Sequence, residues 1–125
     1  WLKNLNYPDE VKEFLSEIDI FLLLSGLEGL GQTIIESLLM KKPTIASNCG
    51  GIPELIIDNE TGMLVETGDS EAIIENIRKL SNNPEFGKQI AEKGHNKMKK
   101  EFAWKEVARK FKDIIKTAER DRNIE

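Results

Sequence analysis

Apolar residues near the start of the chain first recur at the spacing of a helix and then run together as in a buried strand. The helical set lies after Pro8, where a helix can begin: Val11, Phe14, Leu15 and Ile18. The run that follows, residues 18–24 with the sequence IDIFLLL, is short and almost wholly apolar. This pattern predicts a strand that is buried on both faces, as in a parallel sheet.

A glycine-rich turn, SGLEGLG, separates this strand from a second helical pattern, QTIIESLLMKK. The predicted helix carries an apolar stripe made of Ile34, Ile35, Leu38 and Leu39. We expect Lys41 and Lys42 to lie at its C-terminal end, where the helix dipole is negative. Pro43 closes the helix and opens a second short strand, PTIAS.

The rest of the chain alternates once more between helix and strand and then becomes helical. A brief helix is predicted at IPELI and a third strand at GMLVE, after the turn-forming DNETG. Either Asp69 or Ser70 could cap the next helix, and Asn83-Pro84 begins another. Apolar stripes mark the first and last of these late helices: Ile73, Ile74, Ile77 and Leu80, then Trp104, Val107, Ala108, Phe111, Ile114, Ile115 and Ala118.

This order of elements predicts the α/β class. Strand, helix, strand, helix, strand makes right-handed parallel units, so we expect a three-layer, Rossmann-like sheet of about three strands. Such a sheet is half of a doubly wound one, and a helical C-terminal tail follows it. A chain of 125 residues has room for one domain, so residues 1–125 are interpreted as a single partial domain.

Composition excludes several classes of function. Eighteen basic against 22 acidic residues give a net charge of −4, which argues against a nucleic-acid partner. One cysteine, Cys49, and one histidine, His95, cannot form a disulfide or a metal site, so we expect no metal and no cofactor. The longest apolar run is far short of the roughly 20 residues that span a bilayer. We expect a soluble, cytoplasmic protein, and the opening on Trp1 indicates a chain cut from a longer one.

The turn after the first strand is the predicted ligand site, because ligands of open α/β sheets bind beyond the carboxyl ends of the strands. Gly29 and Gly31 let the backbone approach a ligand closely. The helix that begins near Gly31 directs its N–H groups and its positive dipole end at the same place. A phosphate group is the natural occupant of such a position.

Two glutamates flank this position. Glu36 lies about 7–8 Å down the helix from Gly31, which is roughly the offset between a diphosphate and the ribose of one nucleotide. A carboxylate there can accept hydrogen bonds from both ribose hydroxyls, and Glu28 would face a sugar on the far side of the phosphates. The nearest downstream cations, Lys41 and Lys42, are about 15 Å away, so cations for the leaving group must come from outside this segment.

The ordered set of motifs resembles glycosyltransferase family 4 and its GT-B relatives. Glu28 and Glu36 bracket seven residues in EGLGQTIIE, and PTIAS, GGIPELI, ETGMLVETGD and the EFAW of residues 101–104 follow in order. The resemblance covers roughly residues 11–118 and corresponds to the later half of the C-terminal domain of a GT-B glycosyltransferase. Two positions depart from the family pattern without touching the inferred chemistry: Leu24 replaces a usual Pro, and Lys42 a common Gly.

The resemblance implies retaining, metal-independent transfer of a hexosyl group from a UDP-, GDP- or ADP-sugar to an acceptor glycan or glycolipid. It implies that Glu28, the catalytic residue, contacts the donor sugar, and that Glu36 binds the ribose. The other implied substrate-binding residues are Gly29, Leu30, Gly31, Gln32 and Thr33. The family's N-terminal domain and its basic phosphate-binding pair have no counterpart here, so we expect the segment alone to be inactive.

Other interpretations stay open beside this one. Glu36 also fits a solvent-facing helix residue, and Glu28 a charge that only caps the helix. A non-catalytic module that binds the nucleotide sugar is a second function, and glycoside hydrolysis by the two carboxylates is a third. The dinucleotide fingerprint G-x-G-x-x-G is ruled out because position 34 is Ile.

Two groups of residues outside the turn also admit more than one role. The basic stretch of the late helix fits a solvated face better than peripheral contact with an anionic membrane: Lys88, Lys93, Lys97, Lys99 and Lys100. Gly50, Gly51, Pro53 and Glu54 are further candidates for the lining of the site, and Cys49 is expected to pack as a small apolar residue.

Overall fold

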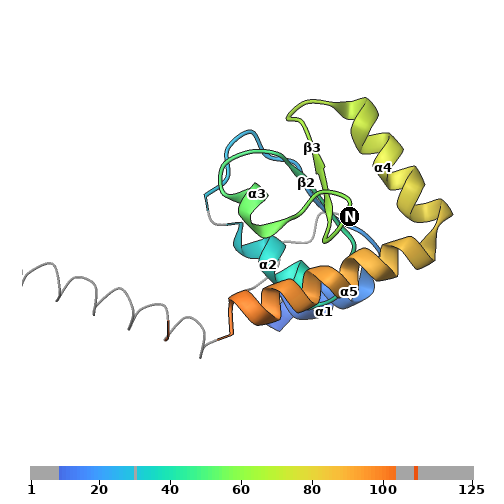
Figure 1. The fold of residues 1–125 in the computed structure, drawn as a ribbon. Helices are drawn as coiled ribbons and strands as arrows, with labels where there is room; N and C mark the ends of the chain where they lie inside the picture. The colour runs from blue at the N-terminus through green and yellow to red at the C-terminus, as the bar shows by residue number, and fades with distance from the viewer. Residues whose placement is uncertain (1–8, 30, 104–108, 110–125) are drawn as a thin grey trace, which may run out of the picture.

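Three parallel strands form the centre of the molecule in the computed structural model, which describes residues 9–29, 31–103 and 109 (Figure 1). The strands are β1 (Phe21–Leu23), β2 (Thr44–Ser47) and β3 (Met63–Val65), in the spatial order β1-β2-β3. In their register Leu22 is the partner of Ile45, and Ile45 is the partner of Met63. The predicted α/β class and parallel sheet are confirmed.

Five helices accompany the sheet within the described residues: α1 (Asp9–Glu17), α2 (Gln32–Leu39), α3 (Ile52–Leu55), α4 (Ser70–Asn82) and α5 (Pro84–Glu101). Each of them was predicted from the pattern of apolar residues and turns. The expected final helix, with its stripe from Trp104 to Ala118, lies outside the described residues, and so does Pro8.

The sheet has an apolar core on each face, which is why the fold has three layers. Side chains of β2 alternate, so Ala46 faces one core and Ile45 faces the other. The first core joins the sheet to α2, α3 and α5 through buried residues that include Ile34, Leu38, Ile52, Leu55 and Met98. The second core joins it to α4 and the start of α5 through Met63, Val65, Leu80 and Ile90. Figure 1 shows α2 and α3 on one side of the strands and α4 on the other.

Strand β1 is less buried than its sequence predicted. Leu22 is 41% exposed and Leu24 is 47% exposed, although Ile45 and Met63 in the same row of the sheet are fully buried. The layer on that face is α4, which packs on β3 at the other edge of the sheet. The expectation of a strand buried on both faces is therefore wrong for β1.

The two lysines after α2 have other partners than the dipole of that helix. Helix α2 ends at Leu39 with no basic residue in its last turn. Lys42 Nζ donates to Ser16 O at 3.1 Å and to Ile18 O at 2.9 Å, so it satisfies carbonyl groups at the end of α1. Lys41 Nζ pairs with the Glu92 carboxylate of α5 at 2.9 Å. Both lysines thus follow the C-terminal end of α2, as predicted, but their ammonium groups bind other elements.

Candidate functional site

The loop between β1 and α2 ends at a glycine that begins the helix. Gly31 lies just before α2 in the left-handed region, at φ 62°, where glycine is favoured. Its carbonyl oxygen accepts from Ile34 N at 2.9 Å and from Ile35 N at 3.2 Å, which closes the first turn of the helix. Because the loop follows Leu23, the last residue of β1, the start of α2 lies beyond the carboxyl end of that strand. Among the described residues, no side chain caps this helix by a hydrogen bond, so Glu28 does not act as such a cap.

Glu36 is held against the start of its own helix. It is half-buried, and its Oε2 is shielded from solvent. Its Oε1 accepts a hydrogen bond from Gln32 Nε2, one turn earlier in α2, at 3.3 Å. The Glu36 carboxylate is therefore only partly open to solvent. Two of the predicted site residues, Gln32 and Glu36, are brought together.

The other predicted site residues surround the same turn. Glu28 is half-buried, whereas Gly29, Gln32 and Thr33 are exposed. A Cβ atom built on Gly29 would meet nothing within 4 Å in the described structure, so there is room for a ligand beside its backbone. Leu30 lies outside the described residues.

A second glycine turn, between β2 and α3, packs directly on this loop. Gly51 N donates to Glu28 O at 3.4 Å. A Cβ atom on Gly50 would lie 1.9 Å from Glu28 O, and one on Gly51 would lie 2.5 Å from Gly29 O. The two turns meet backbone to backbone, and only glycine fits at Gly50 and Gly51.

Hydrogen bonds between small polar groups connect the carboxyl ends of the three strands. Ser25 N donates to Ser47 Oγ at 3.1 Å, and Ser25 O accepts from Cys49 Sγ at 3.3 Å and from Thr67 Oγ1 at 3.5 Å. Cys49 also packs on the first core, as expected of a small apolar residue. Sequence reasoning missed the network, although the three hydroxyl residues each lie within two residues of the carboxyl end of a strand. That shared position is the signal that could have found them.

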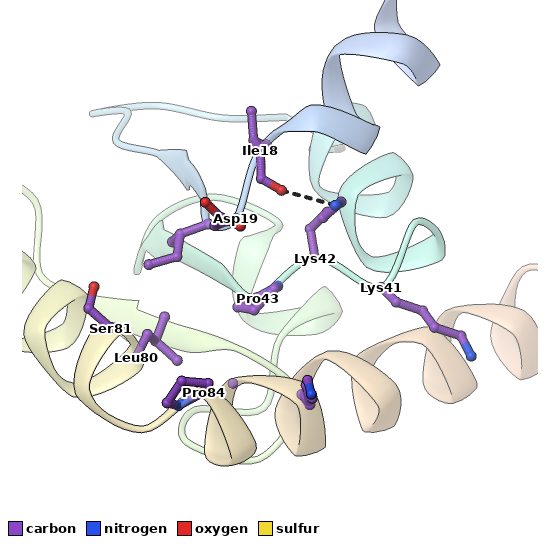
Figure 2. Close-up of a pocket in the computed structure, with 11 residues that line it drawn as sticks. Ile18, Asp19, Lys41, Lys42, Pro43, Leu80, Ser81 and Pro84 are labelled. Carbon is purple, nitrogen blue, oxygen red and sulfur yellow. Dashed lines mark hydrogen bonds between the residues drawn. The ribbon is translucent and has the colours of Figure 1, made fainter.

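A cavity of about 550 Å³ lies elsewhere, at the amino ends of the strands (Figure 2). Ile20 and Pro43, which precede β1 and β2, line it together with Leu80 and Pro84 from α4 and α5. The hydrogen bond from Lys42 to Ile18 crosses one side of it. None of the predicted site residues contributes to this cavity, so it is separate from the candidate site.

Within residues 9–29, 31–103 and 109, no three His, Cys, Asp or Glu side chains are grouped so that they could hold a metal ion. None of the helices in this part of the chain has the length and apolar character needed to cross a bilayer.

Residues 1–97 match the family model described as glycosyl transferases group 1. The chain belongs to this family. It is 29% identical over 110 residues to the capsular polysaccharide biosynthesis glycosyltransferase CapM of Staphylococcus aureus, a match that covers 85% of this chain and 29% of CapM. The chain spans less than a third of the length of the curated relatives that it matches first.

Solved structures of other proteins have the same fold. The C-terminal domain of LpcC from Francisella tularensis, a group 1 family protein, matches with a TM-score of 0.72 and 27% identity, over 79% of this chain and 50% of that one. The Anabaena protein HepE in complex with UDP-glucose matches with a TM-score of 0.77 and 22% identity, over 92% of this chain and 31% of HepE. The resemblance to family 4 and the GT-B fold is thus confirmed.

Proposed function

We propose that this chain is the donor-binding segment of a retaining glycosyltransferase, which transfers a hexosyl group from a nucleoside-diphosphate sugar to an acceptor glycan or glycolipid. The observation that carries the proposal is the start of α2. Gly31 opens this helix at the carboxyl end of β1, and half-buried Glu36 lies about one turn further along. A phosphate at the helix start and a ribose at Glu36 would fit one nucleotide along this helix.

Each residue has a distinct part in the proposed reaction. The bond between the sugar C1 and the diphosphate oxygen breaks, and negative charge develops on the diphosphate. The acceptor hydroxyl oxygen bonds to C1 on the same face, and its proton passes to the departing diphosphate. The backbone of Gly29–Thr33 and the dipole of α2 would stabilise that charge. Glu36 would accept hydrogen bonds from the ribose hydroxyls, while Glu28 would bind the sugar and hold C1 in place for the acceptor.

The donor and the acceptor are proposed from relatives and chemistry together. HepE was solved with UDP-glucose, and CapM takes part in capsular polysaccharide biosynthesis. The HepE complex supports a nucleotide-sugar donor for the present chain, and the likeness to CapM supports a glycan product. UDP, GDP and ADP share the diphosphate and ribose that this site would bind.

The complete enzyme is proposed to contain more than this chain. As one partial domain, the chain would supply the ribose and sugar contacts, and an N-terminal GT-B domain would supply the acceptor site. The cations that bind the diphosphate would also come from outside it, since Lys41 and Lys42 are engaged with Glu92 and with the end of α1. We accordingly propose that the segment alone is inactive.

A cytoplasmic location, with or without peripheral membrane contact, completes the proposal. The α5 lysines are not equally available for such contact. Lys97 Nζ pairs with Glu101 at 2.7 Å and donates to Glu54 O at 2.8 Å, and its side chain is only 14% exposed. The outward-facing members of the stretch are Lys88, Lys93, Lys99 and Lys100.

A transfer assay on the complete protein tests this proposal against its alternatives. UDP-, GDP- and ADP-sugars would be offered with glycan and glycolipid acceptors, and the anomeric configuration of the product would be read by NMR. Transfer with retention is the expected result, and Glu28→Gln should lower it by at least about tenfold. Donor binding without turnover on any acceptor would favour the binding module. Cleavage of a simple glycoside without nucleotide binding would favour hydrolysis.

A further inference from the structure

The turn between β2 and α3 is in backbone contact with the residue proposed to bind the donor sugar. Gly50 is in the left-handed region at φ 54°, and a Cβ atom there would lie 1.9 Å from Glu28 O and 2.9 Å from Glu28 C. Gly51 has an ordinary φ of −83°, yet a Cβ atom there would lie 2.5 Å from Gly29 O. Real Cβ atoms essentially never approach other atoms this closely. Any side chain in this turn would therefore displace the backbone of residues 28–29.

Two hydrogen bonds tie the turn to the loop at separate points. Gly51 N donates to Glu28 O at the tip of the loop, and Cys49 Sγ donates to Ser25 O at its base. These two bonds hold the loop at Ser25 and at Glu28. The position of Glu28 therefore depends on the turn between β2 and α3. Glu36 lies on α2, and its Oε1 accepts a hydrogen bond from Gln32 of the same helix at 3.3 Å.

We propose that the Cys49-Gly50-Gly51 turn is a positioning element for Glu28, which sets the placement of the donor sugar separately from that of the nucleotide. The inference rests on the proposed role of Glu28. These three residues act through the Glu28 backbone and need not touch the substrate. The turn would thus control turnover and sugar selectivity, and α2 with Glu36 would control nucleotide affinity.

Alanine substitution at Gly51 in the complete protein tests whether the turn controls sugar transfer more than nucleotide affinity. Gly51→Ala adds one methyl group against Gly29 O without requiring an unusual φ. We expect kcat for sugar transfer to fall by about 10²-fold, because small displacements of reacting groups have effects of that size. The Kd for the free nucleoside diphosphate should rise by much less than kcat falls, because Gly29 is only one end of the Gly29–Thr33 backbone that would hold the diphosphate.

Gly68→Ala is the matched control. Gly68 has a positive φ of 84°, and a Cβ atom there would meet nothing within 4 Å in the described structure. The variant therefore carries backbone strain without a steric clash, and both kcat and Kd should remain unchanged. A thermal melt of each variant separates a displaced loop from a misfolded protein.

Cys49→Ala serves as the second variant if Gly51→Ala does not fold. It deletes the thiol that donates to Ser25 O and adds no atoms. We expect it to lower kcat several-fold with the nucleotide Kd unchanged. Unchanged kcat in a folded Gly51→Ala, or in Cys49→Ala where it replaces that variant, would overturn the positioning role. So would a loss of nucleotide affinity equal to the loss of turnover. If the unsubstituted protein transfers no sugar and binds no nucleotide, it is the proposed function that fails.

Discussion

Gln32 Nε2 donates to Glu36 Oε1 at 3.3 Å, across one turn of α2. Gln32 is the first residue of the helix whose start is the proposed phosphate site, and Glu36 is the fifth. The contact restrains the Glu36 carboxylate, so a ribose would meet an acceptor that is already oriented. A restrained carboxylate binds with less loss of side-chain entropy than a mobile one.

Gln32→Ala should therefore weaken nucleotide binding without abolishing it. We expect the Kd to rise about two- to fivefold, which corresponds to about 0.5–1 kcal/mol for one neutral donor lost from a carboxylate. Calorimetric titration of the complete protein measures it, with Gln89→Ala on the exposed side of α5 as the control. An unchanged Kd would show that the pair has no part in binding.

Two glycines of α5 should respond to alanine in opposite ways. A Cβ atom at Gly94 would lie 2.6 Å from Thr61 O and 2.8 Å from Leu38 Cδ2, whereas one at Gly87 would make ordinary contacts at 3.6 Å or more. Gly94→Ala should lower the free energy of unfolding by about 1–3 kcal/mol through overpacking. Gly87→Ala should raise it by up to about 1 kcal/mol, because alanine favours the helix. Urea unfolding of both variants measures the difference, and equal effects would contradict the packing of α5 on α2.

The cap of α4 can be assigned by a pair of substitutions. Asp69 Oδ1 accepts from Ala72 N at 3.0 Å, so Asp69 and not Ser70 supplies the capping oxygen that the sequence left undecided. Asp69→Ala should cost about 1 kcal/mol of stability. Ser70→Ala, the control, should change it by less than about 0.5 kcal/mol. Thermal unfolding of both variants decides the matter, and a larger effect at Ser70 would refute the assignment.

A buried hydroxyl pair connects α2 to β2. Ser37 Oγ lies 2.9 Å from Thr44 Oγ1, and both residues are almost fully buried. Ser37→Ala alone should cost about 0.5–1.5 kcal/mol, because it removes one buried hydrogen bond while the Thr44 hydroxyl keeps Lys42 O as a partner. The double variant with Thr44→Val should cost less than the sum of the two single ones. Exact additivity in chemical unfolding would mean that the two hydroxyl groups are not coupled.

Local patterns were sufficient for most of the fold. Ile34 and Leu38 are both fully buried, as the helical spacing of the second stripe predicted, and the short strand predicted at PTIAS is β2. The start of α2 at Gly31 followed from glycine chemistry. These features depend on residues that are neighbours in sequence, which is why periodicity and turn rules describe them.

Contacts between distant segments were not predictable in the same way. No spacing rule connects Lys42 to the end of α1, and the same holds for Gly50 and Glu28, which are 22 residues apart. The exposure of Leu22 depends on which part of the sheet α4 covers. Sequence reasoning thus found the residue types of the candidate site. What holds Glu28 in place is seen only in the packing of the glycine turn between β2 and α3.

The ribose role of Glu36 is the central claim, and calorimetric titration of UDP, GDP and ADP into the complete protein, with Glu36→Ala alongside, tests it most directly. We expect one of the three nucleotides to bind, and Glu36→Ala to weaken it by more than about tenfold, or 1.4 kcal/mol. A Glu36→Ala variant that binds the nucleotide as tightly as the unsubstituted protein would contradict the claim.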